Sequence, residues 1–476
     1  MGVDQADCPE THRGDEEGDG GITQTPVMTR PKSALGVVYC DSSPMAPVAQ
    51  ENDRRDESEL EKQQTTMSQT TCEETYPEGG LRAWLVVLGA WFALMSSMGL
   101  MNTIGVFQAY ALSHQLKGQN EGTVGWIFSI YTFLAFFCGV YIGPVFDKYG
   151  PRRLVVAGCI TTVVGVICTS FCKELWQFAL SFGVLCGFGT SLLFTPCIAA
   201  VGHWFRRRRG FATGIAATAG GTGGIIFPLM LTALFDKIGY GWATRALALV
   251  CLVGGVVGIL LVRSRLPPAE DAKAHPDFRI FQQAPFALTA AGIFLLEFSM
   301  FIPLAYISTY AEHVGFDARF AFHLLPIMNA GSVVGRGLPG YYADVVGPFN
   351  VCIFSVLLSL VACLCVWLPL GHTTAGIVVF SLLFGFGSGT SICMAPVCVG
   401  RLCKTQQYGR YYAATYTVVS FACLIGIPIG GNIVRASGGD YRNLIIFTGA
   451  MYVGSAAALM GAKVTQLGGR KWLAAY

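Results

Sequence analysis

The strongest constraint on this chain is a succession of apolar stretches, each about as long as a bilayer is thick. A helix needs about 20 apolar residues to cross the hydrocarbon core of a membrane. After residue 80 such stretches follow one another, separated by short loops. The pattern predicts an all-α membrane protein with twelve transmembrane helices, at about 84–108, 123–146, 154–172, 176–202, 210–235, 242–262, 285–310, 322–343, 349–369, 374–400, 411–434 and 441–462.

The distribution of charge divides the chain into two unlike parts. Residues 81–476 hold 12 acidic and 26 basic side chains among 396 positions, far below the roughly 25% charged residues of a soluble domain. Residues 1–80 hold 17 acidic and 6 basic side chains and few aromatic ones. Such a segment buries too little apolar surface to offset its ordering entropy, which predicts a disordered acidic cytoplasmic tail over 1–80. It has no secretory signal pattern.

Basic residues between the predicted helices indicate how the chain is oriented. Lys148, Arg152, Arg153 and the run Arg206–Arg209 all fall in loops on the same side as the tail. This bias predicts that both termini are cytoplasmic, and we expect a plasma-membrane location. A run of four arginines could also bind nucleic acid, but its place between two helices favours a topology anchor facing anionic lipid.

The two halves of the chain repeat one another. The pattern G-x-G-T-S-x-x-x-x-P occurs at residues 187–196 and again at 387–396. The pattern G-x-x-x-D-x-x-G-P occurs at residues 143–151 and again at 340–348. Several matches at nearly one offset, each between equivalent helices, indicate an internal duplication.

Six helices per half give both halves the same orientation, which is a parallel repeat about an axis along the membrane normal. We therefore expect an N-terminal six-helix bundle at 81–262, a short cytoplasmic linker at 263–284 and a C-terminal six-helix bundle at 285–476 with a short cytoplasmic C-terminus. Such an architecture implies alternating access, in which the bundles rock about a site between them. One chain holds both halves, so a monomer suffices.

The segment GPVFDKYGPRR contains Gly143, Asp147, Arg152 and Arg153. Gly143 allows close helix approach, and Asp147 can accept hydrogen bonds from helix N-terminal amides or pair with Arg152 or Arg153. We expect a conformational latch, meaning a contact formed in one conformation and broken in the other. The repeat copy keeps Asp344 without the basic residues, so we expect a weaker contact there. The segment resembles the signature loop of the major facilitator superfamily.

Two further motifs narrow the resemblance. PEGGLRAWLVVLGAW (residues 77–91) resembles the first-helix entry of the monocarboxylate porter family, and HWFRRRRGFATGIAATAGGTGG (residues 203–224) resembles that family's second signature. The combination is similar to the fungal branch. The resemblance implies the twelve-helix major facilitator fold and transport of a small organic solute.

The resemblance also implies candidate substrate-binding residues. Arg336 matches the arginine that binds the substrate carboxylate in animal members of the family. The family's acidic partner one turn earlier falls at Ser332, and its first-helix lysine falls near Asn102. Since those two groups accompany proton-linked monocarboxylate uptake, their replacement favours a different, larger or less acidic substrate.

Two other kinds of residue are candidates on their chemistry. Glu297 is the only acid well inside a predicted helix, and an intramembrane acid can carry a proton, although a structural hydrogen bond would also explain it. Aromatic residues such as Tyr306 and Tyr416 can line a cavity, although packing is the more common role of aromatic residues in membrane helices.

The sequence argues against other chemistries. The glycine run at residues 220–224 lacks the Lys and Ser or Thr of a phosphate-binding loop. The membrane helices contain no H-E-x-x-H or G-x-S-x-G motif, and the cysteines lack metal-ligand spacing. We therefore expect no cofactor, no metal, no nucleic-acid partner and no enzymatic activity.

The sequence leaves three functional hypotheses. The first is a secondary active transporter that exports a secondary metabolite or organic acid, with protons as a candidate coupling ion. The second is proton-linked uptake of a monocarboxylate or a riboflavin-like vitamin. The third is a membrane sensor that uses a transporter fold without transporting.

Overall fold

The computed structural model describes residues 77–119, 121–265 and 278–467. These belong to one compact unit, Thr75–Tyr476. The predicted tail, apart from residues 77–80, the middle of the predicted linker and the last nine residues lie outside the described residues. All regular elements in the described part are helices, as the apolar pattern predicts.

The described first half of the chain contains eight α-helical segments. One π-helical turn, Met95–Gly99, lies between the first two segments, and another, Ala179–Cys186, lies between the sixth and seventh. The segments are α2 (Leu81–Leu94), α3 (Ile104–Ser113), α4 (Glu121–Phe137), α5 (Gly139–Tyr149), α6 (Arg152–Thr169), α7 (Leu175–Phe178), α8 (Gly187–Trp204) and α9 (Arg209–Leu261).

The second half follows a short 3-10 turn at Phe278–Gln282, and a further π-helical turn lies at Ala362–Trp367. Its helices are α10 (Ala284–Val314), α11 (Ala318–Val346), α12 (Pro348–Val361), α13 (Leu368–Leu370), α14 (Thr374–Arg401), α15 (Tyr408–Ala436) and α16 (Arg442–Leu467).

Ten helical stretches in the described residues are long and apolar enough to cross a membrane. One of them, α9, has 53 residues, about 80 Å of helix at 1.5 Å per residue, which is far more than one crossing needs. Gly239 interrupts it with φ 76° and ψ 165°, so α9 is two consecutive spans. The predicted break between 235 and 242 is therefore confirmed.

The twelfth span is α11, which has 29 residues but is not among the ten apolar stretches. Its lower hydropathy follows from Arg319, Arg336 and Asp344, which all lie on it. The predicted twelve-helix all-α fold is thus confirmed, and Arg336 lies on the span that is not among the ten apolar stretches.

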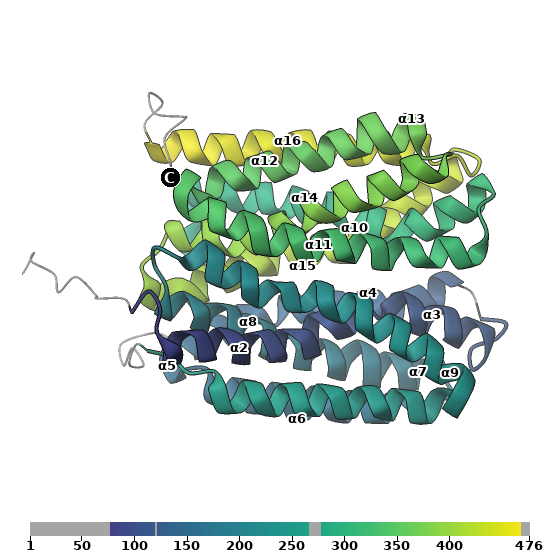
Figure 1. The fold of residues 1–476 in the computed structure, drawn as a ribbon, viewed down its shortest axis with the longest axis horizontal. Coiled ribbons are helices and arrows are strands. Elements are labelled where there is room, and N and C mark those ends of the chain that lie inside the picture. The colour runs from purple at the N-terminus through teal and green to yellow at the C-terminus, as the bar shows by residue number, and fades with distance from the viewer. Residues whose placement is uncertain (1–76, 120, 266–277, 468–476) are drawn as a thin grey trace, which may run out of the picture. The chain divides into compact units, whose positions relative to one another are not determined.

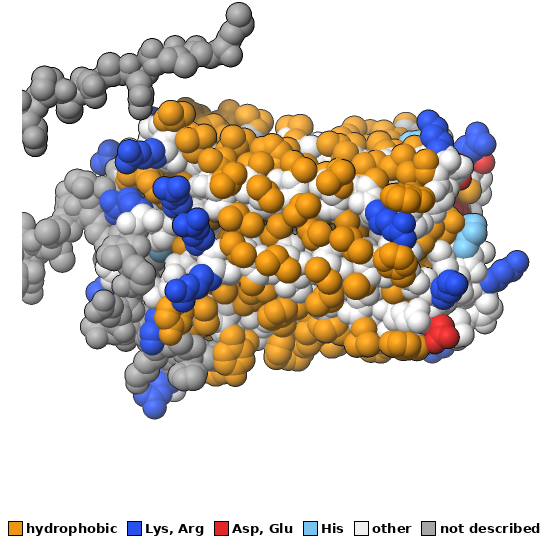
Figure 2. Space-filling view, turned by 90° about the horizontal axis from the view of Figure 1, so that it is seen from below, with side chains coloured by type: hydrophobic (Ala, Val, Ile, Leu, Met, Phe, Trp, Pro, Cys, Tyr) orange, Lys and Arg blue, Asp and Glu red, His pale blue; other side chains and the backbone are white. Residues whose placement is uncertain are grey.

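The helices form two six-helix bundles that lie side by side. In Figure 1 the first bundle, from α2 to α9, occupies the lower half, and the second, from α10 to α16, occupies the upper half. Figure 2 shows a broad band of hydrophobic side chains across the middle of one face, with Lys and Arg gathered at both ends. A multi-pass membrane protein needs this distribution, because its middle contacts lipid.

Glycines let helices within a bundle approach closely. A side chain on Gly335 or Gly331 of α11 would overlap the carbonyl oxygens of Phe386 and Leu382 on α14. Without a strong hydrophobic drive in lipid, such backbone-to-backbone packing is a main source of helix association.

We expect Gly335→Val to destabilise the second bundle by about 1–3 kcal/mol, because the added side chain overfills a close helix contact. The thermal transition of the detergent-solubilised protein would measure this. Gly337→Ala is the matched control on the same helix, since its new methyl group would lie 3.7 Å from Thr218 Cγ2, an ordinary contact. Equal melting temperatures for the two variants would contradict the role given to this contact.

Candidate functional site

A cavity lies between the two bundles at the middle of the helices. Its volume is about 60 Å³, room for a few water molecules in this conformation. The cavity combines apolar walls with a few polar groups. It is lined by Met98, Met101, Asn102, Phe136, Phe194, Glu297, Met300, Phe301, Leu304, Met328, Asn329, Ser332, Arg336, Ser388, Ile392 and Tyr416.

The Arg336 guanidinium is the principal charged group of this cavity. The residue lies on α11 and is 5% exposed. Its Nη1 donates a hydrogen bond to the backbone carbonyl of Ala217 on α9, 2.8 Å away, while its Nε has no partner. Gly220 makes room for it, since a side chain there would overlap the guanidinium. The cation is therefore held at the bundle interface by a neutral carbonyl.

Glu297 faces the same cavity from α10 and is 2% exposed. No salt bridge joins Glu297 and Arg336 in the described structure, although both line the cavity. The two side chains thus lie around one cavity without touching each other. A buried ion that is not in contact with a partner carries an unfavourable desolvation cost.

Asn102 and Ser332 also line the cavity. Asn102 lies between the π-helical turn Met95–Gly99 and α3, and its Nδ2 donates to the carbonyls of Met98 (2.9 Å) and Gly220 (3.2 Å). Both side chains are neutral where the family resemblance predicted charged ones. Arg336 therefore has neither a nearby lysine nor an acid one turn earlier on its helix.

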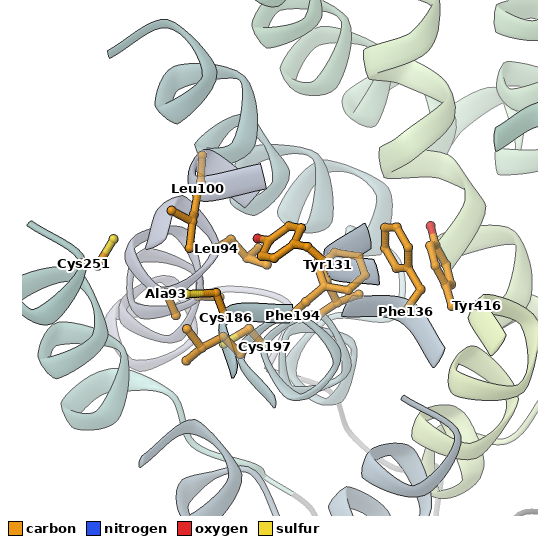
Figure 3. Packing of buried hydrophobic residues seen from close by; sticks show 14 of the residues in the cluster. Ala93, Leu94, Leu100, Tyr131, Phe136, Cys186, Phe194, Cys197, Cys251 and Tyr416 are labelled. Carbon is orange, nitrogen blue, oxygen red and sulfur yellow. The ribbon is translucent and has the colours of Figure 1, made fainter. Parts of the chain in front are cut away.

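The aromatic wall of the cavity joins the two bundles. Tyr416 on α15 lies against Phe136 and Phe194 of the first bundle, with ring centroids 5.4 and 5.7 Å apart. Figure 3 shows Phe194, Phe136 and Tyr416 grouped together, with Tyr416 reaching them from the other bundle. The Tyr416 hydroxyl is buried without a hydrogen-bond partner.

Tyr306 is the one predicted substrate contact that does not line this cavity. Its hydroxyl donates to the carbonyl of Ile427 on α15, 2.7 Å away, and its ring packs against Gly430 and Gly431. A tyrosine hydroxyl in a membrane interior needs an acceptor, and the backbone of α15 supplies it here. In this structure Tyr306 packs α10 against α15, and its contact with the substrate remains a prediction.

Several lining residues were missed from the sequence. Asn329 lies seven residues before Arg336, on the same face of α11, and donates to the Gly224 carbonyl at 3.4 Å. That helical spacing from Arg336 could have identified it. Ser388 lies within the repeated G-x-G-T-S motif. The four methionines carry no pattern that separates lining residues from packing residues.

The two motif aspartates lie at one end of the bundles, called here the aspartate end. Asp147, at the end of α5, accepts hydrogen bonds from the backbone N–H groups of Gly409 (3.0 Å) and Arg410 (2.9 Å). These amides begin α15 of the other bundle, where the helix dipole favours a negative charge. The sequence predicted that Asp147 would bond either to helix N-terminal amides or to Arg152 or Arg153. The structure shows the helix N-terminal amides.

Arg152 and Arg153 do not take part in this contact. Both are exposed at the start of α6, and no ion pair joins either of them to Asp147 in the described residues. Gly143, by contrast, lies directly against α15, because a side chain on it would overlap the Gly409 carbonyl.

Asp344 makes the repeat-related contact. At the end of α11 it accepts from the backbone N–H groups of Gly210 (2.7 Å) and Phe211 (2.9 Å), which begin α9 of the first bundle. We expected the Asp344 contact to be weaker than the Asp147 contact. Their geometries do not differ in this way, because each aspartate accepts two hydrogen bonds from backbone amides. Each bundle thus caps one helix of the other, and the bundles are joined at the aspartate end.

The fold and this interface are those of a membrane protein built from two repeat-related helix bundles that are joined at one end. The family model "Major Facilitator Superfamily" matches residues 86–427, and the chain belongs to that superfamily. Among solved structures, the chain is similar to the human organic anion transporter MFSD10 (TETRAN). The TM-score is 0.63 at 14% identity, over 80% of this chain and 100% of that one. This likeness shows the shared fold.

Curated fungal relatives match along most of their length. The chain is 36% identical to "MFS-type transporter 1" of an Ophiocordyceps species, over 83% of this chain and 88% of that protein. It is 34% identical to the "Fujikurins efflux protein" of Gibberella fujikuroi, over 84% and 87%. It is 33% identical to the "Riboflavin transporter MCH5" of Saccharomyces cerevisiae, over 79% and 77%.

We expect Asp147→Ala to loosen the aspartate end. Hydrogen bonds to a charged acceptor contribute about 1.5–3 kcal/mol each, and about 1.4 kcal/mol is a factor of ten in an equilibrium. Peptide-resolved maleimide labelling should therefore show at least about a tenfold faster reaction at Cys403, the half-buried thiol beside Asp147. Asp236→Asn, an exposed carboxylate at the opposite end, is the matched control. Unchanged labelling at Cys403 in Asp147→Ala would contradict the assignment.

Proposed function

We propose that this protein exports an anionic secondary metabolite or organic acid by alternating access, with Arg336 binding the anionic group. The observation that carries the proposal is a buried guanidinium between the bundles, bonded to one neutral carbonyl and in contact with no acid. A carboxylate suits a guanidinium because two parallel hydrogen bonds can form. A ligand of this kind would contact Arg336 directly, which Glu297 on the same cavity does not do.

The walls of the cavity support a solute with an apolar body. Met98, Met101, Met300 and Met328 line it together with aromatic rings. Methionine is flexible and polarizable, and it adapts to irregular ligand surfaces. Together with the efflux name of the Gibberella fujikuroi relative, this favours export of a metabolite larger than lactate. Asn102, Asn329, Ser332 and Tyr416 would then bind its polar groups.

Uptake of a riboflavin-like vitamin is the second candidate, because the Saccharomyces cerevisiae relative carries that name. Proton-linked monocarboxylate uptake has less support, since Asn102 and Ser332 replace the charged groups associated with it. A sensor without transport remains the third hypothesis. Deletion of the gene separates the first two, because export predicts accumulation of a metabolite in the cell and uptake predicts failure to take up a vitamin.

Within the superfamily we propose membership of the monocarboxylate porter family, in its fungal branch. The two motifs that carry the resemblance contact each other. The carboxylate of Glu78, in the first motif, accepts hydrogen bonds from the backbone N–H groups of Arg206 (2.9 Å), Arg207 (2.7 Å) and Arg208 (3.0 Å), in the second. This contact would explain why the two motifs occur together, because the carboxylate of the first motif bonds the backbone amides of the second.

We further propose that the aspartate end faces the cytoplasm of a plasma-membrane protein with both termini inside. The basic loop residues support this orientation, and α2 begins and α16 ends at this end (Figure 1). The proposed boundaries remain 81–262 and 285–476 for the bundles. Asp147, Gly143 and Asp344 would then form the cytoplasmic latch, whereas Arg152 and Arg153 would serve as exposed topology residues.

The Arg336 assignment can be tested by transport into proteoliposomes. Wild-type protein, under an imposed proton gradient, is screened with monocarboxylates, riboflavin and polyketide-type acids. We expect Arg336→Gln to lower kcat/KM for the transported acid at least about 100-fold, the effect of about 3 kcal/mol from a lost buried charge contact. Arg245→Gln is the control, since Arg245 stacks on Phe171 and Trp242 away from the cavity. Equal flux in both variants would remove Arg336 from the site.

Glu297 is our proposed proton-coupling residue. We expect Glu297→Gln, which keeps the shape and removes the ionisable proton, to abolish gradient-driven accumulation while leaving exchange of solute for solute. Counterflow and gradient-driven uptake, measured on the same proteoliposomes, separate the two steps. Gradient-driven accumulation at the wild-type rate in Glu297→Gln would exclude this carboxylate as the proton carrier.

A further inference from the structure

Arg209 is buried at the aspartate end, although its neighbours in the four-arginine run are exposed. It begins α9 and is 7% exposed, in contrast to the lipid-facing role expected of the whole run. Its Nη2 donates to the carbonyl of Gly202 at 2.9 Å, and its Nη1 donates to the carbonyl of Gly400 at 3.1 Å. Its guanidinium carbon lies 4.4 Å from the ring centroid of Tyr408.

Two glycines, one from each bundle, build the slot that holds this guanidinium. Gly202 is close to the end of α8 and Gly400 close to the end of α14, one in each bundle. A Cβ on Gly202 would lie 2.7 Å from Nη2 and 2.9 Å from the Tyr408 ring, and a Cβ on Gly400 would overlap Nη1. Any larger residue at either position would displace the arginine or the tyrosine.

The charge of Arg209 is as poorly compensated as that of Arg336. Its hydrogen-bond acceptors are backbone carbonyls, and its buried Nε has no partner. No acidic side chain makes a salt bridge with it in the described residues. A buried cation normally requires an ionic partner, so the bundle interface contains two guanidiniums that can each accept an anion.

A column of tyrosines on α15 connects the two arginines. Tyr408, Tyr412 and Tyr416 follow one another at one-turn spacing, with ring centroids 5.9 and 4.7 Å apart. The first packs on Arg209 and the last lines the central cavity. The hydroxyls of Tyr412 and Tyr416 are buried, and neither makes a hydrogen bond of normal geometry.

We propose that Arg209 and this tyrosine column form a second anion-binding station, which loads an aromatic or conjugated carboxylate from the cytoplasmic side. This rests on the proposed function and orientation. Separation of the bundles at the aspartate end would break the contact between Arg209 Nη1 and Gly400 of the other bundle. Nη1 would then be released, and a carboxylate could bind along the Nη1/Nη2 or the Nε/Nη2 edge, because Nη2 has a second N–H besides the one bonded to Gly202. The tyrosines would offer ring faces and hydroxyls to the conjugated body.

The test is transport measured from each face separately. The full-length protein is assayed in right-side-out and inside-out membrane vesicles with 2-naphthoate and, as its neutral counterpart, 2-naphthamide. We expect Arg209→Gln to raise the KM for 2-naphthoate about tenfold at the cytoplasmic face and leave it unchanged at the outer face. Tyr412→Phe should shift the KM at the cytoplasmic face in the same direction by a smaller factor. Arg207→Gln, an exposed arginine of the same loop, should change neither.

The outcomes separate this station from the central site. If Arg336→Gln abolishes flux while Arg209→Gln and Tyr412→Phe leave both KM values unchanged, the station is overturned and the proposed function stands. A change of KM at both faces, or of kcat alone, would assign Arg209 to closing the aspartate end and would also overturn it. Transport of 2-naphthamide without 2-naphthoate in the wild type would overturn the anionic class. Should Arg209→Gln fail to fold, Arg209→Lys and Tyr412→Phe give the same comparison.

Discussion

The arrangement of this transporter depends on two carboxylates that cap helices of the opposite bundle. Asp147 accepts from the first amides of α15, and Asp344 from the first amides of α9. Each contact places a carboxyl group where a helix dipole is positive. Because the two contacts are related by the internal repeat, they hold the bundles at matching points of one end.

The same end also explains why charged groups are found deep in the interface. Asp344 binds the N-terminus of α9, and Arg209 is the first residue of that helix. From there α9 packs along α11 as far as Arg336. Both guanidiniums are bonded to carbonyl oxygens of the bundle interface. In a medium without water, such positions are expensive unless a ligand or a partner neutralises them. A route for an anion between the bundles would explain why both arginines are buried there, because the anion would neutralise each guanidinium.

Much of the candidate site could be predicted because intramembrane polar residues are rare. Arg336, Glu297, Asn102, Ser332 and Tyr416 were identified from composition and resemblance, and the structure brings all five to one cavity. Tyr306 lies outside this cavity, and the sequence could not indicate that, because an aromatic residue in a helix gives no indication of which neighbour it meets. Arg209 was missed, because a run of four arginines looks uniform although its last member turns inward.

The sequence alone determined the number of spans, their duplication and the pair of motif aspartates, since hydrophobic length and repeated spacing are local properties of a chain. It also indicated that Asp147 would prefer helix amides or nearby arginines. Only the tertiary structure decided between these partners, and only it showed that the amides belong to the other bundle. The choice depends on which helix ends meet across the interface, and glycines such as Gly143 and Gly210 allow that approach. Contacts between residues some 130 to 260 positions apart arise from packing, which no local pattern encodes.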